Sequence, residues 1–264
     1  MRNHKVSAGV VALVAMTAAA CSDSTGPGGT QQVRIAFSAG GTQAALAGSG
    51  ASLLGDEIVL QGTNGTLVIQ DLRVIVSEFE LDRVSDDACA VEDDDSCESF
   101  EAPPAFVDVP LAGGQAVVVT GPVAPDTYDE LEFEIEDLED DEEDPAKAQQ
   151  ISNLLATIRG QFADWPRDAS MLVTGTFTPT GGQPIPFRVY FEAEVEIEMA
   201  LNPPVTVTEG TAGTFTVTLA PELWFRSGGG TVMNLAALDY AATGKVVEFK
   251  FEMEDGFTEV EFDD

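Results

Sequence analysis

Histidine is almost absent from this chain, whose only histidine is His4, and cysteine is rare, with three residues among 264. Without a histidine beyond residue 4, the chain has no catalytic triad or dyad with a histidine base and no zinc site with histidine ligands. The glycine-rich phosphate-binding loop, the dinucleotide-binding turn and the H-E-x-x-H motif are absent too. Carboxylate chemistry remains available, and a glycosidase needs only two well-placed carboxyl groups.

Basic residues are also scarce, since 12 lysines and arginines stand against 46 aspartates and glutamates, for a formal net charge of −34. A surface this negative repels polyanions, so no nucleic-acid partner is expected. The charge can serve cation binding, contacts with basic proteins or plain solubility. A salt-rich habitat would explain it without any ligand.

The N-terminal segment has the pattern of an export signal. Residues 1–20 combine a basic start, an apolar middle and a small-residue end, which is typical of a secretory signal peptide. The sequence Ala18-Ala19-Ala20-Cys21 resembles the lipobox of bacterial lipoproteins, with Ala18 in place of the usual leucine. The resemblance implies that Cys21 becomes the lipidated first residue, and Ser22 in place of aspartate implies the outer membrane. Ordinary signal cleavage just before Cys21 is the alternative.

The cysteine count agrees with lipidation. Cys89 and Cys97 lie close enough in sequence to form a disulfide in an oxidising compartment, which leaves Cys21 as an odd thiol unless it carries lipid. Cleavage before Cys21 leaves 10 basic and 46 acidic residues, a net charge of −36. Residues 21–30 then form a lipidated cysteine and a flexible polar tether. Residues 31–264 are predicted to be one domain, because no polar linker divides them.

The remaining chain is organised around residues 187–201, in which apolar odd positions alternate with mostly glutamate at even positions. This alternation predicts a strand with one dry and one wet face. Fully extended, the segment would span roughly 50 Å, so a bend or bulge is expected within it. Pro203 and Pro204 mark its expected end. Because two paired acidic rows would repel, its glutamates are expected beside Lys250, an uncharged row or solvent, unless a cation lies between.

Alternation predicts further strands at residues 32–37, 57–84, 106–111, 115–120, 127–136, 171–177, 205–207, 214–219, 223–225, 247–253 and 257–262. Within 57–84 the apolar parity switches twice, which predicts irregularities near Gln70-Asp71 and near Ser77-Glu78. Gly113-Gly114 and Asp255-Gly256 each predict a hairpin that joins the strands on either side.

One helix is predicted, at residues 145–160. Asp144 is a suitable N-cap, and Pro145 suits the first helical position. Apolar residues then recur at helical spacing, at Ile151, Leu154, Leu155 and Ile158. Many short strands, frequent glycine and proline turns and a single helix favour an all-β, antiparallel β-sandwich, immunoglobulin-like or related.

Three segments resemble parts of a known group of proteins: Leu67-Val68-Ile69, Thr127-Tyr128-Asp129 and Pro186-Phe187. They are similar to strand entries in uncharacterised β-sandwich domains of bacterial surface lipoproteins. The resemblance implies a β-sandwich on a lipid anchor. That family offers no catalytic residues to carry over.

Two acidic clusters are candidate cation sites, because hard cations such as calcium prefer carboxylate oxygens. The first lies in the loop between the paired cysteines and comprises Asp93, Asp94 and Asp95. The second is the dense run before the helix, whose candidate ligands are Asp137, Glu139, Asp140, Asp141 and Asp144. A solvated loop tip explains the first cluster without a ligand, and stabilisation of the helix dipole explains part of the second.

These observations favour a non-catalytic, lipid-anchored protein of the cell envelope, facing the periplasm or the cell surface. It would have a structural role or bind a protein or glycan partner, with no cofactor except possible calcium. One alternative is a calcium- or cation-binding module, and another is a carbohydrate-binding or carboxylate-dependent glycosidase-like protein. Of the adjacent Trp224 and Phe225, one could be exposed as a binding anchor, although a covered rim is favoured.

Overall fold

The computed structural model describes residues 31–39, 51–53, 57–84, 98–111, 113–138, 144–210, 212–249 and 254–263. Several predicted features lie outside these residues: the lipidated Cys21, the Cys89–Cys97 disulfide, Asp93, Asp94, Asp95, Glu139, Asp140 and Asp141. Among the described residues, no helix is both long enough and apolar enough to cross a membrane.

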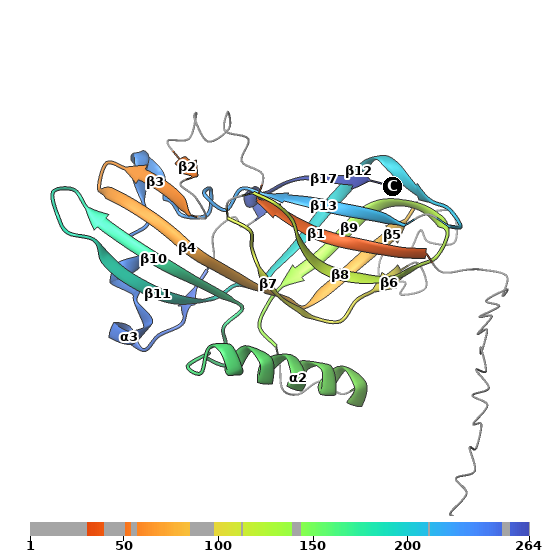
Figure 1. Cartoon of the computed structure of the whole chain (residues 1–264), viewed down its shortest axis with the longest axis horizontal. Coiled ribbons are helices and arrows are strands. Elements are labelled where there is room, and N and C mark those ends of the chain that lie inside the picture. The colour runs from red at the N-terminus through yellow and green to blue at the C-terminus, as the bar shows by residue number, and fades with distance from the viewer. Residues whose placement is uncertain are drawn as a thin grey trace, which may run out of the picture.

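The described residues form three sheets, a two-stranded ribbon and two α-helices, which confirms the all-β sandwich-like class (Figure 1). The N-terminal sheet has the order β17 (Phe257–Asp263), β13 (Gly213–Leu219), β1 (Gln31–Ala39), β8 (Ala116–Val123). The central sheet has the order β16 (Val247–Glu248), β11 (Ile185–Glu192), β10 (Met171–Pro179), β4 (Gly65–Val76), β3 (Ile58–Gly62), β2 (Ala51–Leu53), with β7 (Ala105–Asp108) also paired to β4. The third, named here the acidic sheet, has the order β12 (Val195–Val207), β9 (Asp126–Ile135), β5 (Glu78–Arg83), β6 (Glu98–Glu101).

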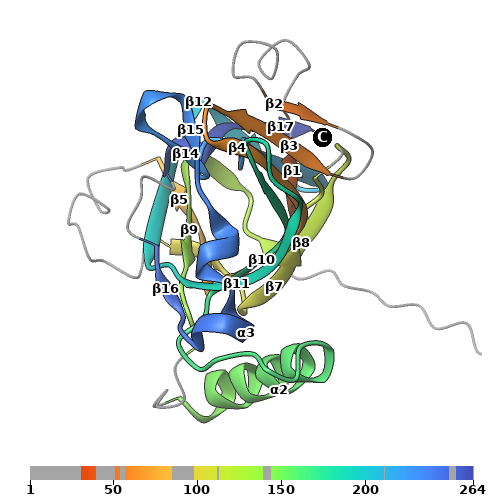
Figure 2. The same cartoon turned by 90° about the vertical axis from the view of Figure 1, so that its left-hand side faces the viewer.

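The N-terminal and acidic sheets pack face to face over one core. Phe37 of β1 contacts Phe133 of β9, with 5.4 Å between ring centroids, and Phe133 in turn contacts Phe257 of β17 at 5.1 Å. At the rims of this sandwich, β12 lies beside β17, and β6 lies beside β8. The end-on view in Figure 2 shows the strands arranged around this shared interior. Most pairings are antiparallel, but β1 with β13 and β11 with β16 are parallel.

The segment 187–201 is bent as predicted, and the bend also moves the chain from one sheet to another. Strand β11 ends at Glu192 in the central sheet, and β12 begins at Val195 in the acidic sheet. The buried Ser170 holds the junction, because its Oγ donates to the carbonyl of Ala193 at 2.9 Å and accepts from the Ala193 N–H at 2.7 Å. The predicted end at Leu201 is wrong.

Strand β12 continues through Pro203 and Pro204 to Val207, with a register shift between Ala200 and Val205. The prolines are accommodated because β12 is an edge strand, where a missing N–H breaks no sheet ladder. The peptide bond between Asn202 and Pro203 is cis.

The two irregularities predicted within 57–84 are confirmed. In β4, Asp71 pairs with Thr174 and Ile69 with Gly175, so Gln70 is the extra residue of a bulge. At Ser77 the chain leaves the central sheet, and β5 begins in the acidic sheet at Glu78. Each parity switch therefore keeps the apolar side chains turned toward the core.

The hairpin predicted at Gly113-Gly114 is wrong. Strands β7 and β8 flank Gly113-Gly114, but β7 pairs with β4 and β8 pairs with β1. Strand β17 pairs with β13, whereas β16 pairs with β11, so these two strands belong to different sheets. The hairpin predicted at Asp255-Gly256 stays a prediction, because its first strand includes residues outside the described ranges. Residues 250–253 are not described.

The predicted helix is confirmed as α2 (Pro145–Gln161), with Asp144 as its N-cap. Its buried residues Leu155 and Ile158 pack on the outer face of the central sheet, against Leu172 and Tyr190 (Figure 1). The favoured interpretation of Trp224 and Phe225, that both are covered, is confirmed, and neither is an exposed anchor. Trp224 is 3% exposed and Phe225 is fully buried, because the segment forms a turn rather than a strand.

Candidate functional site

The outer face of the acidic sheet carries acidic side chains that meet in register across three strands. Strand β9 supplies the middle row, with Glu130, Glu132 and Glu134 at alternate positions. The cross-strand partners on either side are also acidic: Glu196↔Glu134, Glu198↔Glu132, Glu78↔Glu134, Glu80↔Glu132 and Asp82↔Glu130. We call these eight residues the carboxylate face.

This arrangement overturns the expected neighbours of the glutamates in β12. They were expected beside Lys250, an uncharged row or solvent, yet Glu196 and Glu198 lie opposite Glu134 and Glu132. The reason is that the buried side sets the register: Ile197 pairs with Phe133, and a slip of one residue would expose both side chains. The expectation allowed one exception, a cation between two acidic rows. That exception stays a prediction.

Three members of the carboxylate face lie close enough to share one ion. Single carboxylate oxygens of Asp82, Glu130 and Glu132 all lie within 4.8 Å of one another, and all three residues are half-buried. They come from two neighbouring strands, since Asp82 stands opposite Glu130 and Glu132 is the next outward residue of β9. Oxygen ligands in this number and spacing are what a calcium ion accepts, with water completing its shell.

The electrostatics of the carboxylate face oppose full ionisation. Burial, then the hydrogen bond with Glu196, then the nearby charges of Glu196, Glu80 and Asp82 raise the pKa of Glu132 to about 8. Burial and the charge of Glu198 raise the pKa of Glu130 above its usual range. Burial, followed by the charge of Asp129, likewise raises the pKa of Asp82. Mutual repulsion therefore destabilises this surface unless a proton or a cation offsets it.

Within the described ranges, the ion pairs found lie away from this cluster. Arg73 pairs with Asp71 and Asp108, and Arg188 pairs with Asp164. Arg83 follows Asp82 in β5, but its guanidinium turns to Asp126, with 3.6 Å between Nε and Oδ2. In the part of the chain that the structure describes, no arginine or lysine forms an ion pair with the three clustered carboxylates.

Two of the predicted cation ligands are described, and they have separate surroundings. The Asp144 carboxylate accepts hydrogen bonds from the N–H groups of Lys147 and Ala146, at 3.1 and 2.6 Å, and these bonds lower its pKa. It thus acts as the helix cap. Burial, then the nearby charge of Asp168, raise the pKa of Asp137.

The group that the structure brings together contains neither Asp137 nor Asp144. Alternation in the sequence identifies each acidic row of the carboxylate face, but no local signal states that the rows are neighbours. That information depends on the pairing of β5, β9 and β12.

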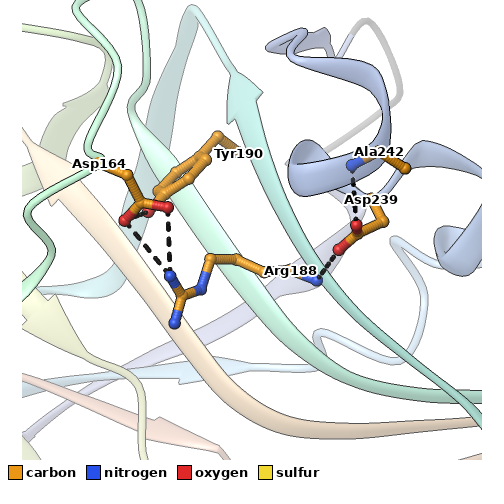
Figure 3. Close-up of polar contacts among 5 residues, drawn as sticks. All are labelled: Asp164, Arg188, Tyr190, Asp239 and Ala242. Atoms are coloured by element: carbon orange, nitrogen blue, oxygen red, sulfur yellow. Dashed lines mark hydrogen bonds and ion pairs between the residues drawn. The ribbon is translucent and has the colours of Figure 1, made fainter.

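A second polar cluster, shown in Figure 3, lies beside α3 (Tyr240–Thr243) and is internally paired. Asp164 accepts a hydrogen bond from the Tyr190 hydroxyl at 3.0 Å and forms an ion pair with Arg188 at 3.2 Å. Asp239 accepts from the backbone N–H of Arg188 at 2.9 Å and from that of Ala242 at 3.1 Å. These contacts fasten the segment after α2 and the start of α3 to strand β11, which is a structural role.

Comparison of the chain with protein-family models, with curated proteins and with solved structures finds no significant match to any of them. The functional argument therefore depends on the geometry of the carboxylate face.

Proposed function

We propose that the protein is a non-catalytic, lipid-anchored component of the cell envelope whose carboxylate face binds a hard divalent cation such as calcium. Asp82, Glu130 and Glu132 are the proposed primary ligands. The observation that supports this most is the registered pairing of acidic rows on β5, β9 and β12, with three carboxylate oxygens within 4.8 Å of one another. A divalent cation at this point neutralises the charges that the fold brings together.

Calcium fits this surface better than a transition metal. The three ligands are carboxylates, whereas zinc and copper sites in proteins draw on histidine or cysteine. The carboxylate oxygens of Asp82, Glu130 and Glu132 lie on an open face of the sheet. Water can therefore supply the remaining ligands of a six- to eight-coordinate ion. An exposed site of this kind favours a weak, reversible affinity, in the range of extracellular calcium modules, roughly 10⁻⁴–10⁻³ M.

The glycosidase alternative draws on one feature of the same face. A carboxyl group whose pKa is raised to about 8, next to other carboxylates, has the acid–base character that glycoside hydrolysis requires. The geometry of the pair argues against it, because Glu132 and Glu196 are joined by a hydrogen bond. Catalytic carboxyl groups in glycosidases stand about 5–9.5 Å apart, which leaves room for the sugar and water.

Thermal melting of the full chain at constant ionic strength tests the proposal. Calcium at about one hundred times its Kd should stabilise the protein by about 2.7 kcal/mol, which raises the melting temperature by about 5–10 °C. The triple variant Asp82→Asn, Glu130→Gln, Glu132→Gln should lose this shift. The matched control is Glu259→Gln, Glu261→Gln, Asp263→Asn, which replaces the same three types of residue at exposed positions of β17. An equal calcium shift in both variants would refute the site.

The envelope location is supported by the sequence alone, through residues 1–20 and the lipobox-like sequence that ends at Cys21. The structure describes neither segment. An acyl anchor at Cys21 and a tether through residue 30 would hold the domain within reach of the membrane surface, since ten residues extend to at most about 35 Å. Divalent cations are the expected counterions of an acidic protein held there.

A further inference from the structure

A second charged site lies away from the carboxylate face, in the turn that joins β13 to β14 (Arg226–Ser227). Arg226 presents two guanidinium nitrogens, Nε and Nη2, that are buried and have no hydrogen-bond partner among the described residues. Leaving buried donors of a charged group unpaired is costly, and native proteins almost always satisfy them. Two such donors on one guanidinium therefore indicate a partner that the described residues do not supply.

The geometry of these donors restricts the chemistry of that partner. Nε and one terminal nitrogen form the side edge of the guanidinium fork, which pairs with two oxygens of a carboxylate or phosphate group in a bidentate manner. A single neutral acceptor can satisfy only one of the two N–H groups. The pair of free donors on one edge thus matches an oxyanion.

Glu222 lies four residues earlier in the same turn and is 5% exposed. It is close enough that the charge of Arg226 acts on its pKa, yet the two side chains form no ion pair within 4.0 Å. Burial raises the pKa of Glu222, which favours the neutral acid. Glu222 can donate a hydrogen bond to an oxyanion held by Arg226 only as the neutral acid, because an ionised carboxylate would repel the anion.

The loop that follows Arg226 is exposed. Gly228, Gly229 and Gly230 follow directly and are exposed, and a side chain added at Gly228 or Gly229 would meet nothing within 4 Å. Arg226 as a whole is half-buried, and its Nε and Nη2 atoms are themselves buried. We propose that Arg226, with Glu222 beside it, forms a binding site for an oxyanion, either a carboxylate or a phosphate group.

Titration of the full chain with sodium phosphate and, separately, with sodium acetate tests this site, at an ionic strength held constant with chloride. At least one of the two anions should raise the melting temperature to a plateau. A shift with phosphate alone identifies a tetrahedral oxyanion, and a shift with acetate alone identifies a planar carboxylate. The absence of a saturable shift with either anion would overturn the proposal.

Three variants locate the effect. Arg226→Gln removes the charge and the fork, and Arg226→Lys keeps the charge without the fork; both should weaken the anion affinity at least tenfold. Arg159→Gln removes one exposed charge from α2 and should leave the affinity unchanged. Each shift is measured against the same variant in chloride, so a loss of stability alone does not mimic the result. A crystal structure grown in the anion that shows only ordered water on Nε and Nη2 would also overturn the proposal.

Discussion

At the scale of single residues, Glu132 is surrounded by more acidic neighbours of the carboxylate face than its strand neighbours alone would give, so repulsion between carboxylates is strong there. Its neighbours Glu80 and Glu198 stand directly opposite on the two flanking strands, and it shares a hydrogen bond with Glu196. One carboxyl group thus sits between two acidic rows. A proton on Glu132 relieves the repulsion on both sides, as a bound cation would.

The first prediction concerns the pH dependence of stability. Because the pKa of Glu132 rises from 4.5 to about 8 on folding, the folded state holds its proton more tightly than the unfolded chain does. Its contribution to stability is complete below about pH 4.5 and is lost as the pH rises through about 8. Glu132→Gln should flatten the fall in melting temperature across this window and raise the melting temperature at pH 8 by about 1–4 °C.

Thermal melts of this variant between pH 5 and pH 9, without divalent cations, provide the measurement. Glu259→Gln is the control, because it removes an acidic charge from an exposed position of β17. If Glu132→Gln and the control change the pH profile equally, the local repulsion at Glu132 is not the cause.

At the scale of elements, the junction between β11 and β12 decides how the acidic row is presented. Ser170 is fully buried and joins both backbone polar groups of Ala193. Without this hydroxyl, the N–H and the carbonyl of Ala193 would be buried without a partner. The strand would then lose the fixed point at which it passes from the central sheet to the acidic sheet.

Ser170→Ala should therefore lower the free energy of unfolding by about 1–3 kcal/mol, which is the cost of unsatisfied buried polar groups. Denaturant unfolding measures the loss. The matched control is Ser152→Ala on the exposed side of α2, which should change the free energy of unfolding by only a few tenths of a kcal/mol. Equal stability of the Ser170 variant and the wild type would show that the junction does not depend on this hydroxyl.

The sequence predicts elements of this protein better than it predicts their partners. Alternation located β9 and both parts of 187–201, and the parity switches located the bulge at Gln70 and the break at Ser77. These features depend on short-range periodicity. The hairpin at Gly113-Gly114 was wrong, because β7 pairs with β4 and β8 pairs with β1, both distant in sequence.

For the candidate site, too, the sequence predicts the strands better than their pairing. Each acidic row could be read from the sequence, but their pairing depends on contacts such as Ile197 with Phe133, more than sixty positions apart. Repulsion between rows predicted the wrong neighbours, because burial of large apolar side chains outweighs exposed charge repulsion. A buried Ile or Phe contributes about 1.5–3 kcal/mol, against at most about 1 kcal/mol for a cross-strand like-charge pair.

At the scale of the whole molecule, the proposed lipid at Cys21 would place the proposed cation site near the membrane. An anchor with several acyl chains holds firmly, since each buried methylene contributes about 0.8 kcal/mol. Cys21→Ser should move the protein from the membrane fraction to the soluble fraction and remove incorporation of a labelled fatty acid. Cell fractionation with detergent-free washing is the measurement. A variant that stays with the membrane would contradict lipid anchoring.

Calorimetric titration of calcium into the full chain tests the central claim most directly. The account predicts one saturable binding event, which is abolished by Asp82→Asn, Glu130→Gln, Glu132→Gln and retained by Glu259→Gln, Glu261→Gln, Asp263→Asn. A variant with Asp140, Asp141 and Asp144 replaced by asparagine should also retain it. No saturable heat in the wild type, or the same heat after the change at Asp82, Glu130 and Glu132, would contradict the account.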